Sequence, residues 1–122
     1  MLLLYRLPLL LPGMHAARIE TIHATPICVM APGEKLFDLR VDLSGSVAHD
    51  CPPVSYFRAV LRERVWLRRL AAVQGAEVEP ETPLAWFTTT LEEPADGDPA
   101  RVARVAHGGI LAPVSLISGR PD

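Results

Sequence analysis

The pattern of hydrophobic and polar positions predicts one long helix near the middle of the chain, over residues 55–75. Pro52 and Pro53 prevent a helix before this segment, because proline lacks a backbone N–H and pushes its predecessor towards extended geometry. Ser55 can cap the first turn, and Gly75 can end the helix in a left-handed conformation. A step of about 100° per residue creates a broad apolar face, made by Tyr56, Ala59, Val60, Trp66, Leu67, Leu70 and Ala71.

The predicted helix also carries a second, narrower apolar strip, so it needs a packing partner on each side. This strip contains Phe57, Leu61, Val65 and Ala72. Glu63 falls in the middle of the broad face, where no arginine of the helix stands three or four residues away. A curved sheet, or a sheet together with a second subunit, would cover both sides.

Segments before the helix have the composition and alternation of strands. Residues 18–30 are rich in Ile, Thr and Val and are interrupted near Pro26, whereas residues 36–43 alternate between an apolar and a charged face. The turn residues 31–34 stand between the two segments. We therefore predict that the two strands form a hairpin.

Three further strands are predicted after the helix, over residues 84–91, 101–107 and 110–117. Gly108 and Gly109 separate the last two, and they suit a hairpin turn whose central positions both need positive φ. The predicted order is strand, strand, helix, strand, strand, strand. This order indicates an α+β fold in which an antiparallel sheet of about five strands wraps one long central helix.

The ends of the chain are expected to lie outside the domain. Residues 1–13 are apolar but contain Arg6 and two prolines, and they are too few to span a bilayer, which needs about 20 apolar residues. We expect a flexible extension here, upstream of a possible start at Met14, with a secretory signal as the alternative. Residues 14–118 should form a single domain, followed by a loose tail at residues 119–122.

The composition of the chain excludes some classes of function but does not identify one. A chain of 122 residues with 49% hydrophobic and 21% charged residues is typical of one globular domain. The net charge of -2 argues against a nucleic-acid partner, and no segment suits a membrane partner. Cys28 and Cys51 have neither metal-site spacing nor the pattern of a disulfide framework. We therefore expect reduced thiols, a cytoplasmic protein, and neither a metal ion nor a cofactor.

The sequence Ala-His-Asp-Cys-Pro-Pro at residues 48–53 resembles the motif of the hot-dog 3-hydroxyacyl-carrier-protein dehydratases. Their signature is Gly-His-Phe-Pro, a proline-rich loop and a helix that carries an acid. Glu63 follows His49 by fourteen residues, which is the separation in that motif, although Asp50 stands in place of Phe and Cys51 in place of the first Pro. The segment YFRAVLRERVWLRRL is also similar to the central helix of hot-dog acyl-CoA thioesterases. Both likenesses imply a hot-dog fold.

The resemblance implies an acid–base pair for dehydration of a 3-hydroxyacyl thioester. His49 would remove the α-proton and Glu63 would protonate the departing hydroxyl group, the two residues meeting across a dimer interface. Burial among apolar neighbours would raise the pKa of Glu63. Thioester hydrolysis would instead need a carboxylate that activates water, for which Asp42 and Asp50 are the candidates. The side chains expected to contact the substrate are Tyr56, Phe57 and Trp66.

The leading hypothesis is a homodimer that dehydrates an acyl thioester of a carrier protein or coenzyme A. An acyl thioesterase is the enzymatic alternative, and a catalytically inactive hot-dog partner or dimerisation module is the non-enzymatic one. A further alternative is an unrelated α+β protein, or a poorly selected reading frame without a stable fold. At the level of residues, the alternatives are that Glu63 pairs with an arginine from a strand or a partner subunit, and that His49 is a surface histidine. His107 is expected to be an ordinary hairpin residue.

Overall fold

The computed structural model describes residues 1–43 and 54–111, and within these ranges it contains ten strands and no helix. The strands are β1 (Leu2–Arg6), β2 (Ala17–Ile22), β3 (Cys28–Met30), β4 (Lys35–Asp42), β5 (Val54–Leu61), β6 (Val65–Leu70), β7 (Glu77–Val78), β8 (Pro83–Thr88), β9 (Arg101–Val102) and β10 (Val105–Ile110). The predicted α+β fold with a central helix, and with it the hot-dog architecture, is therefore wrong. The protein is an all-β domain in the part of the chain that the structure describes.

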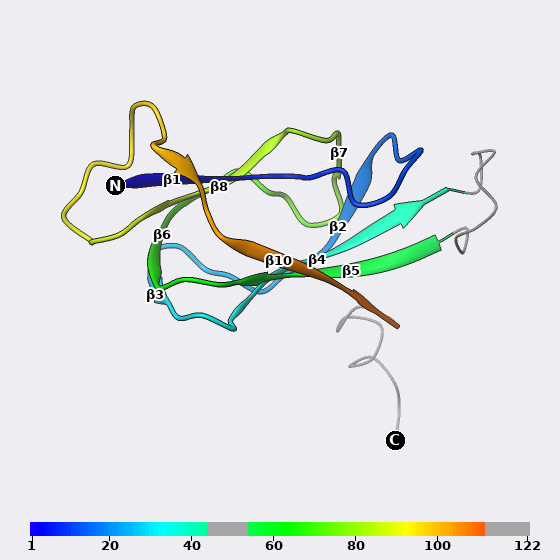
Figure 1. The fold of residues 1–122 in the computed structure, drawn as a ribbon, viewed down its shortest axis with the longest axis horizontal. Helices are drawn as coiled ribbons and strands as arrows, with labels where there is room; N and C mark the ends of the chain where they lie inside the picture. Colours follow the sequence, from blue (N-terminus) through cyan, green and yellow to red (C-terminus); the bar gives the residue numbers. More distant parts are fainter. Residues whose placement is uncertain (44–53, 112–122) are drawn as a thin grey trace, which may run out of the picture.

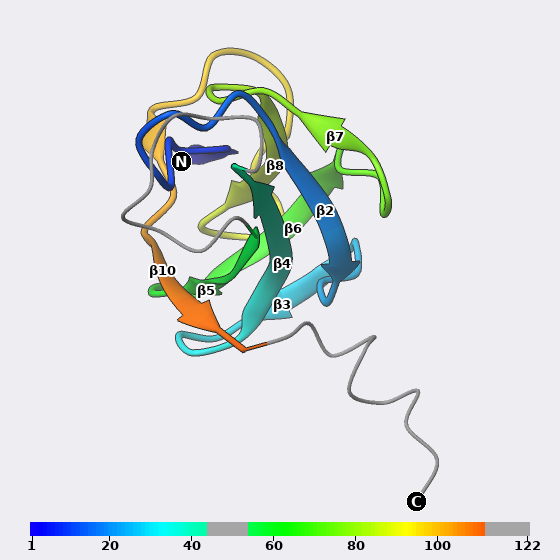
Figure 2. The same ribbon diagram turned by 90° about the vertical axis from the view of Figure 1, so that its right-hand side faces the viewer.

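The strands form two five-stranded sheets (Figure 1). Sheet A has the order β3-β6-β8-β1-β9, and sheet B has the order β10-β5-β4-β2-β7. All pairs are antiparallel except β1 with β9, which run parallel. Figure 2 shows the strands of the two sheets arranged around a common interior.

One hydrophobic core fills this interior. The side chains of β4 alternate as the sequence predicts, so that Phe37, Leu39 and Val41 point into the core and are fully buried. Strands of both sheets contribute to the same cluster, which includes Leu3, Tyr5, Leu7, Ile19, Ala59, Leu61, Val65, Leu67, Leu84 and Phe87. Because each sheet covers the apolar face of the other, no helix is needed to bury these side chains.

The segment predicted as a helix forms β5 and β6, which belong to different sheets. Ala59, Leu61, Val65 and Leu67 are fully buried, and within each strand they are two residues apart. Four-residue steps such as Phe57, Leu61 and Val65 fit a strand as well as a helix, because four is a multiple of the strand period. The segment is also rich in aromatic and β-branched residues, which fit a pleated sheet. Both strands are flanked by neighbours in their sheets, and this pairing decides in favour of β structure.

The apolar N-terminal segment, for which we expected a flexible extension, contains β1 in the structure. This strand lies between β8 and β9 in sheet A. Leu3 and Leu7 have no exposed surface, and Leu4 is 4% exposed. The run of apolar residues therefore serves a strand whose two faces are both covered.

The two strands predicted over residues 18–30 and 36–43 are confirmed, with the interruption near Pro26, as β2, β3 and β4. Their predicted hairpin is wrong in its pairing. β2 pairs with β4, while β3 crosses to the other sheet and pairs with β6. The residues at the turn thus carry the chain from one sheet to the other.

The strand predicted over residues 84–91 is confirmed as β8. The hairpin turn predicted at Gly108 and Gly109 is wrong, because both glycines lie inside β10, where they pair with Arg58 and Phe57. Most of the predicted strand over residues 110–117 lies outside the described residues. In the described part of the chain, no helix is long and apolar enough to cross a membrane.

Candidate functional site

The structure gives Glu63 a different environment from the predicted one. Glu63 lies in the turn between β5 and β6, and Arg101 of β9 donates two hydrogen bonds to its carboxylate, of 2.7 and 2.8 Å. The backbone N–H of Arg104 donates a third, of 2.7 Å. The hydrogen bond from Arg101 is the main reason why the pKa of Glu63 is lowered, so the predicted raised pKa is wrong. The alternative, that an arginine from a strand pairs with Glu63, is confirmed.

The other predicted site residues do not converge within the described part of the chain. His49 and Asp50 lie outside the described residues. Tyr56 and Phe57 are neighbours on β5 and therefore point to opposite faces of sheet B. Trp66 lies on β6, in sheet A. Tyr56 and Phe57 nevertheless border one cavity of about 740 Å³, which Trp66 does not line. The roles of the three residues in substrate binding stay predictions.

A tyrosine–histidine pair, with Tyr5 buried and His107 half-buried, occupies the corner where the two sheets meet. Tyr5 of β1 points into the core between Leu3 and Leu7, and it is 3% exposed. His107 of β10 stands opposite the fully buried Ala59 in the β5–β10 ladder, and cross-strand partners share a face. The Tyr5 hydroxyl group and Nε2 of His107 lie 2.8 Å apart and form a hydrogen bond.

The two rings of this pair also stack. Their centroids are 5.8 Å apart and their planes differ by 24°. The ring of Phe37 lies on the core side of Tyr5, with a centroid separation of 5.6 Å. Phe37, Tyr5 and His107 therefore form a row of aromatic rings that runs from the core towards the edge strand β10.

Burial keeps both members of the pair uncharged at neutral pH. Desolvation raises the pKa of Tyr5 far above its ordinary value, which disfavours the phenolate. Desolvation also lowers the pKa of His107, which disfavours the imidazolium. Whichever tautomer the imidazole adopts, the hydrogen bond joins two neutral groups.

A cavity of about 250 Å³ lies beside this pair. Most of its wall is apolar and comes from β1 with the residues that follow it, and from residues 102–105. Arg6 and Glu81 also border it. Glu81 has φ of 72°, which makes it the one described non-glycine residue with positive φ. The N–H of Glu81 donates a hydrogen bond of 2.7 Å to the carbonyl oxygen of Leu7, the residue that follows β1. This hydrogen bond stabilises the unfavourable conformation of Glu81.

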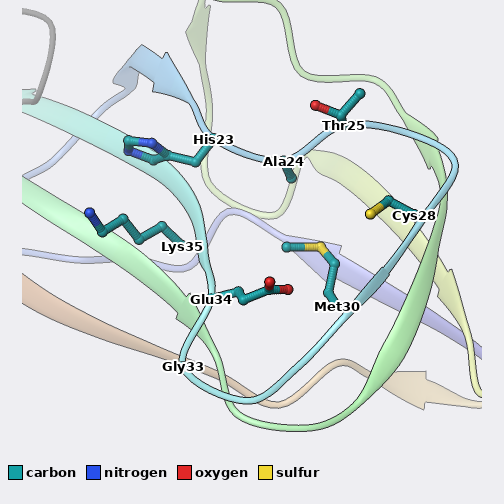
Figure 3. Close-up of a pocket in the computed structure, with 8 residues that line it drawn as sticks. All are labelled: His23, Ala24, Thr25, Cys28, Met30, Gly33, Glu34 and Lys35. Carbon is teal, nitrogen blue, oxygen red and sulfur yellow. The ribbon is translucent and has the colours of Figure 1, made fainter.

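A second cavity, of about 380 Å³, lies within the loop that leaves β2, forms β3 and returns to β4 (Figure 3). Figure 3 shows the side chains of Cys28, Met30 and Glu34 pointing towards the middle of this loop. His23 and Lys35 extend together in another direction, away from the thiol of Cys28. The histidine and the thiol thus do not form the nucleophile–base pair that a thiol hydrolase requires.

His23 belongs instead to a charged cluster on the outer face of sheet B. Asp38 is fully buried, and Arg58 donates hydrogen bonds of 2.8 and 3.2 Å to its two carboxylate oxygens. Nε2 of His23 lies 3.1 Å from the same carboxylate, without the alignment of a hydrogen bond. The hydrogen bond to Asp38 raises the pKa of Arg58. The ion pair of Arg58 with Asp38 joins β5 to β4, while His23 stands beside this pair and also borders the loop cavity.

No known protein family, curated protein or solved structure matches this chain. The interpretation of the site therefore depends on its own geometry.

Sequence reasoning did not find the tyrosine–histidine pair. Tyr5 lies in a segment expected to be a flexible extension, and His107 was expected to be a hairpin residue. No spacing along the chain links residues 5 and 107. One signal was present in the sequence, because Tyr5 is an aromatic residue with a polar group within an apolar run, and such residues find a hydrogen-bond partner when buried.

Proposed function

We propose that this protein binds a small, planar, mostly apolar molecule with one neutral hydrogen-bonding group, in the cavity beside Tyr5 and His107. The observation that carries the proposal is the hydrogen bond between the buried Tyr5 and the half-buried His107 at a mainly apolar cavity. Apolar walls with a few placed polar groups are the usual composition of small-molecule sites. Perturbed pKa values in such a cavity also mark functional positions.

The size of the cavity limits the ligand. A volume of about 250 Å³ is somewhat below the range of about 300 to 1,000 Å³ that is usual for drug-sized ligands. One ring, or two fused rings, would fill it. The row formed by Phe37, Tyr5 and His107 favours a flat ring, because an aromatic ligand could extend the stack.

The charge state of the pair limits the ligand further. Tyr5 and His107 are both neutral at physiological pH, so together they offer no counter-charge to a carboxylate or an ammonium group. The two charged residues that border the cavity, Arg6 and Glu81, are both exposed, so a charged group beside the pair itself would be buried without a partner. That would cost far more than burying a hydroxyl or carbonyl group that is hydrogen-bonded. A neutral polar group is therefore the preferred partner of the pair.

Binding is a better interpretation than catalysis for this cavity. The described residues that line it include no serine, threonine or cysteine that could act as a nucleophile. The acyl-thioester hypothesis stays a prediction. Its expected acid, Glu63, is engaged with Arg101, and its expected base, His49, lies outside the described residues. We also infer a reducing compartment such as the cytoplasm, because Cys28 is a free thiol.

Titration of the isotope-labelled protein with phenol, indole and benzoate, followed by NMR, tests the proposal. Phenol and indole are neutral rings, whereas benzoate is a ring of similar size with a charge. We expect phenol and indole to shift amide resonances of β1 and β10, and benzoate to bind much more weakly. The proposal fails if benzoate binds as well as phenol, or if the shifts occur on other strands.

The chain provides a matched control for the tyrosine, because it has two tyrosines and Tyr56 lies half-buried on β5. Tyr5→Phe removes the hydroxyl group and keeps the ring. It should weaken phenol binding about five- to tenfold, which is the size of one net hydrogen bond. Tyr56→Phe should leave binding unchanged. If Tyr56→Phe weakens binding and Tyr5→Phe does not, the ligand binds near Tyr56, one of the residues that the sequence resemblance placed at the substrate site.

A further inference from the structure

Strand β3 places two sulfur-containing side chains on one face. In the ladder between β3 and β6, Cys28 stands opposite Leu67 and Met30 stands opposite Val65. Leu67 and Val65 are both fully buried in the interior. Because cross-strand partners point to the same side of a sheet, the side chains of Cys28 and Met30 lie on the same side of β3, although only Met30 is buried.

The two sulfur atoms meet the loop cavity at different depths. Met30 is 5% exposed and forms part of the cavity's floor, whereas Cys28 is exposed at its rim. Residues two apart in a strand have Cα atoms about 6.6 Å apart. The methionine side chain has three rotatable bonds, so its thioether can approach the thiol across this separation. The thiol donates a hydrogen bond of 3.2 Å to the carbonyl oxygen of Val29, and this contact is lost when a metal ion replaces the thiol proton. Figure 3 shows both side chains directed towards the middle of the loop.

The donor set selects for one class of metal ion. Thiolate and thioether sulfur are soft ligands that favour Cu(I) over Mg(II) or Ca(II). Zn(II) takes Cys, His, Asp or Glu ligands in tetrahedral sites, and a thioether is not among them. Among the described residues, no group of three or more His, Cys, Asp or Glu side chains could hold a metal ion, which argues against an ordinary zinc site. Glu34 faces the same cavity, but its carboxylate accepts a hydrogen bond of 2.8 Å from the backbone N–H of Ala31. The carboxylate is thus engaged in closing the turn.

We infer that the loop cavity is a site for a soft monovalent metal ion, Cu(I) in the cell, bound between the sulfur atoms of Cys28 and Met30. Binding replaces the thiol proton of Cys28, which is released to solvent, and it changes no oxidation state. The inference is independent of the proposed function, because the two cavities share no residue.

The direct test uses the unmodified chain with isotope-labelled methionine methyl groups. The chain has three methionines, Met1, Met14 and Met30, so each methyl resonance can be assigned. Addition of one equivalent of Ag(I), a redox-stable substitute for Cu(I), should shift the Met30 methyl resonance and leave the other two in place. A shift of Met1 or Met14 instead, or no shift at all, would overturn the inference.

Affinity measurements on variants provide a second test. Cu(I) is titrated anaerobically in competition with a chromophoric Cu(I) chelator. Met30→Leu keeps an apolar side chain of similar volume, and it should weaken binding by at least about tenfold. Cys28→Ser should weaken binding further. The matched controls are Met14→Leu, at another buried methionine, and Cys51→Ser, at the chain's other cysteine. Both variants should bind as the unmodified protein does.

Two results would contradict the site. Equal affinities of the Met30→Leu and Met14→Leu variants would mean that Cu(I) binds to a thiol alone. Loss of binding in Cys51→Ser, with binding retained in Cys28→Ser, would place the ion elsewhere in the chain.

Discussion

The hydroxyl group of Tyr5 and Nε2 of His107 lie 2.8 Å apart, although the two residues come from β1 and β10, near opposite ends of the described chain. Tyr5 belongs to sheet A and His107 to sheet B, so their hydrogen bond joins the two sheets. Any change in the charge of either residue should therefore affect stability as well as ligand binding.

Stability should fall as the pH falls below about 6.5. Burial lowers the pKa of His107 in the folded state from its ordinary value of 6.5, so the unfolded chain binds a proton at a higher pH than the folded chain does. The free energy of unfolding therefore decreases with decreasing pH from about 6.5 down to the folded-state pKa. Urea unfolding between pH 5 and 7.5 measures this slope. His107→Phe should remove it, whereas His15→Gln, at an exposed histidine, should keep it.

Tyr5 produces the opposite dependence at high pH. Its pKa is raised by burial, so above about pH 10 the unfolded chain loses a proton that the folded chain keeps. Stability should therefore fall as the pH rises through this range. Tyr5→Phe should flatten the dependence and Tyr56→Phe should not. An identical alkaline slope in the two variants would contradict the assigned environment of Tyr5.

Arg58 should contribute strongly to stability through Asp38. Asp38 is fully buried, and Arg58→Met would remove the guanidinium group that donates two hydrogen bonds to it. Removing one partner of a buried ion pair costs about 3 to 5 kcal/mol, and we expect the lower end because Arg58 is itself partly exposed. Chemical denaturation measures the loss. Arg40→Met is the matched control, since Arg40 pairs at 3.5 Å with the exposed Asp42, and it should cost about 0.5 kcal/mol or less.

Glu63 should stabilise the folded state at moderately acidic and neutral pH. Its pKa is lowered in the folded state, so its contribution is present above the ordinary value of 4.5 and is lost as the pH falls through the folded-state value. Glu63→Gln should cost about 1 kcal/mol or less at pH 7, because solvent partly screens the pair. The variant should differ less from the unmodified protein at pH 3 than at pH 7. Glu92→Gln, at an exposed position, should show no such difference.

A chain that begins at Met14 should not fold. It lacks β1, which stands between β8 and β9, and so exposes hydrogen-bonding groups and core surface of sheet A. Circular dichroism and thermal unfolding should show no cooperative transition. A milder version is Leu3→Ala, which should cost about 2 to 5 kcal/mol at a fully buried side chain. Leu9→Ala, at a side chain that is 61% exposed, is its control and should have little effect. Normal folding of the shortened chain would contradict this expectation and support the prediction that residues 1–13 are a flexible extension.

Local patterns in the sequence determined several strands. The alternation of Phe37, Leu39 and Val41 with charged residues specifies β4, and the β-branched content around Pro26 specifies β2 and β3. The positive φ expected at Gly75 is present, although it serves a turn before β7 and not the end of a helix. These features depend on neighbouring residues alone, and so they can be recognised along the chain.

The tertiary structure alone decided the rest. The residues from Tyr56 to Leu70 satisfy both a helical and an extended pattern, and only pairing with β4, β10, β3 and β8 selects the strands. Glu63 meets Arg101, and Tyr5 meets His107, through contacts between segments that are far apart in sequence. The periodicity of a short segment can be predicted from its own residues. The distant strand that will pair with its backbone cannot. The choice of partner strand therefore fixed the fold, the charge state of Glu63 and the position of the cavity beside Tyr5 and His107.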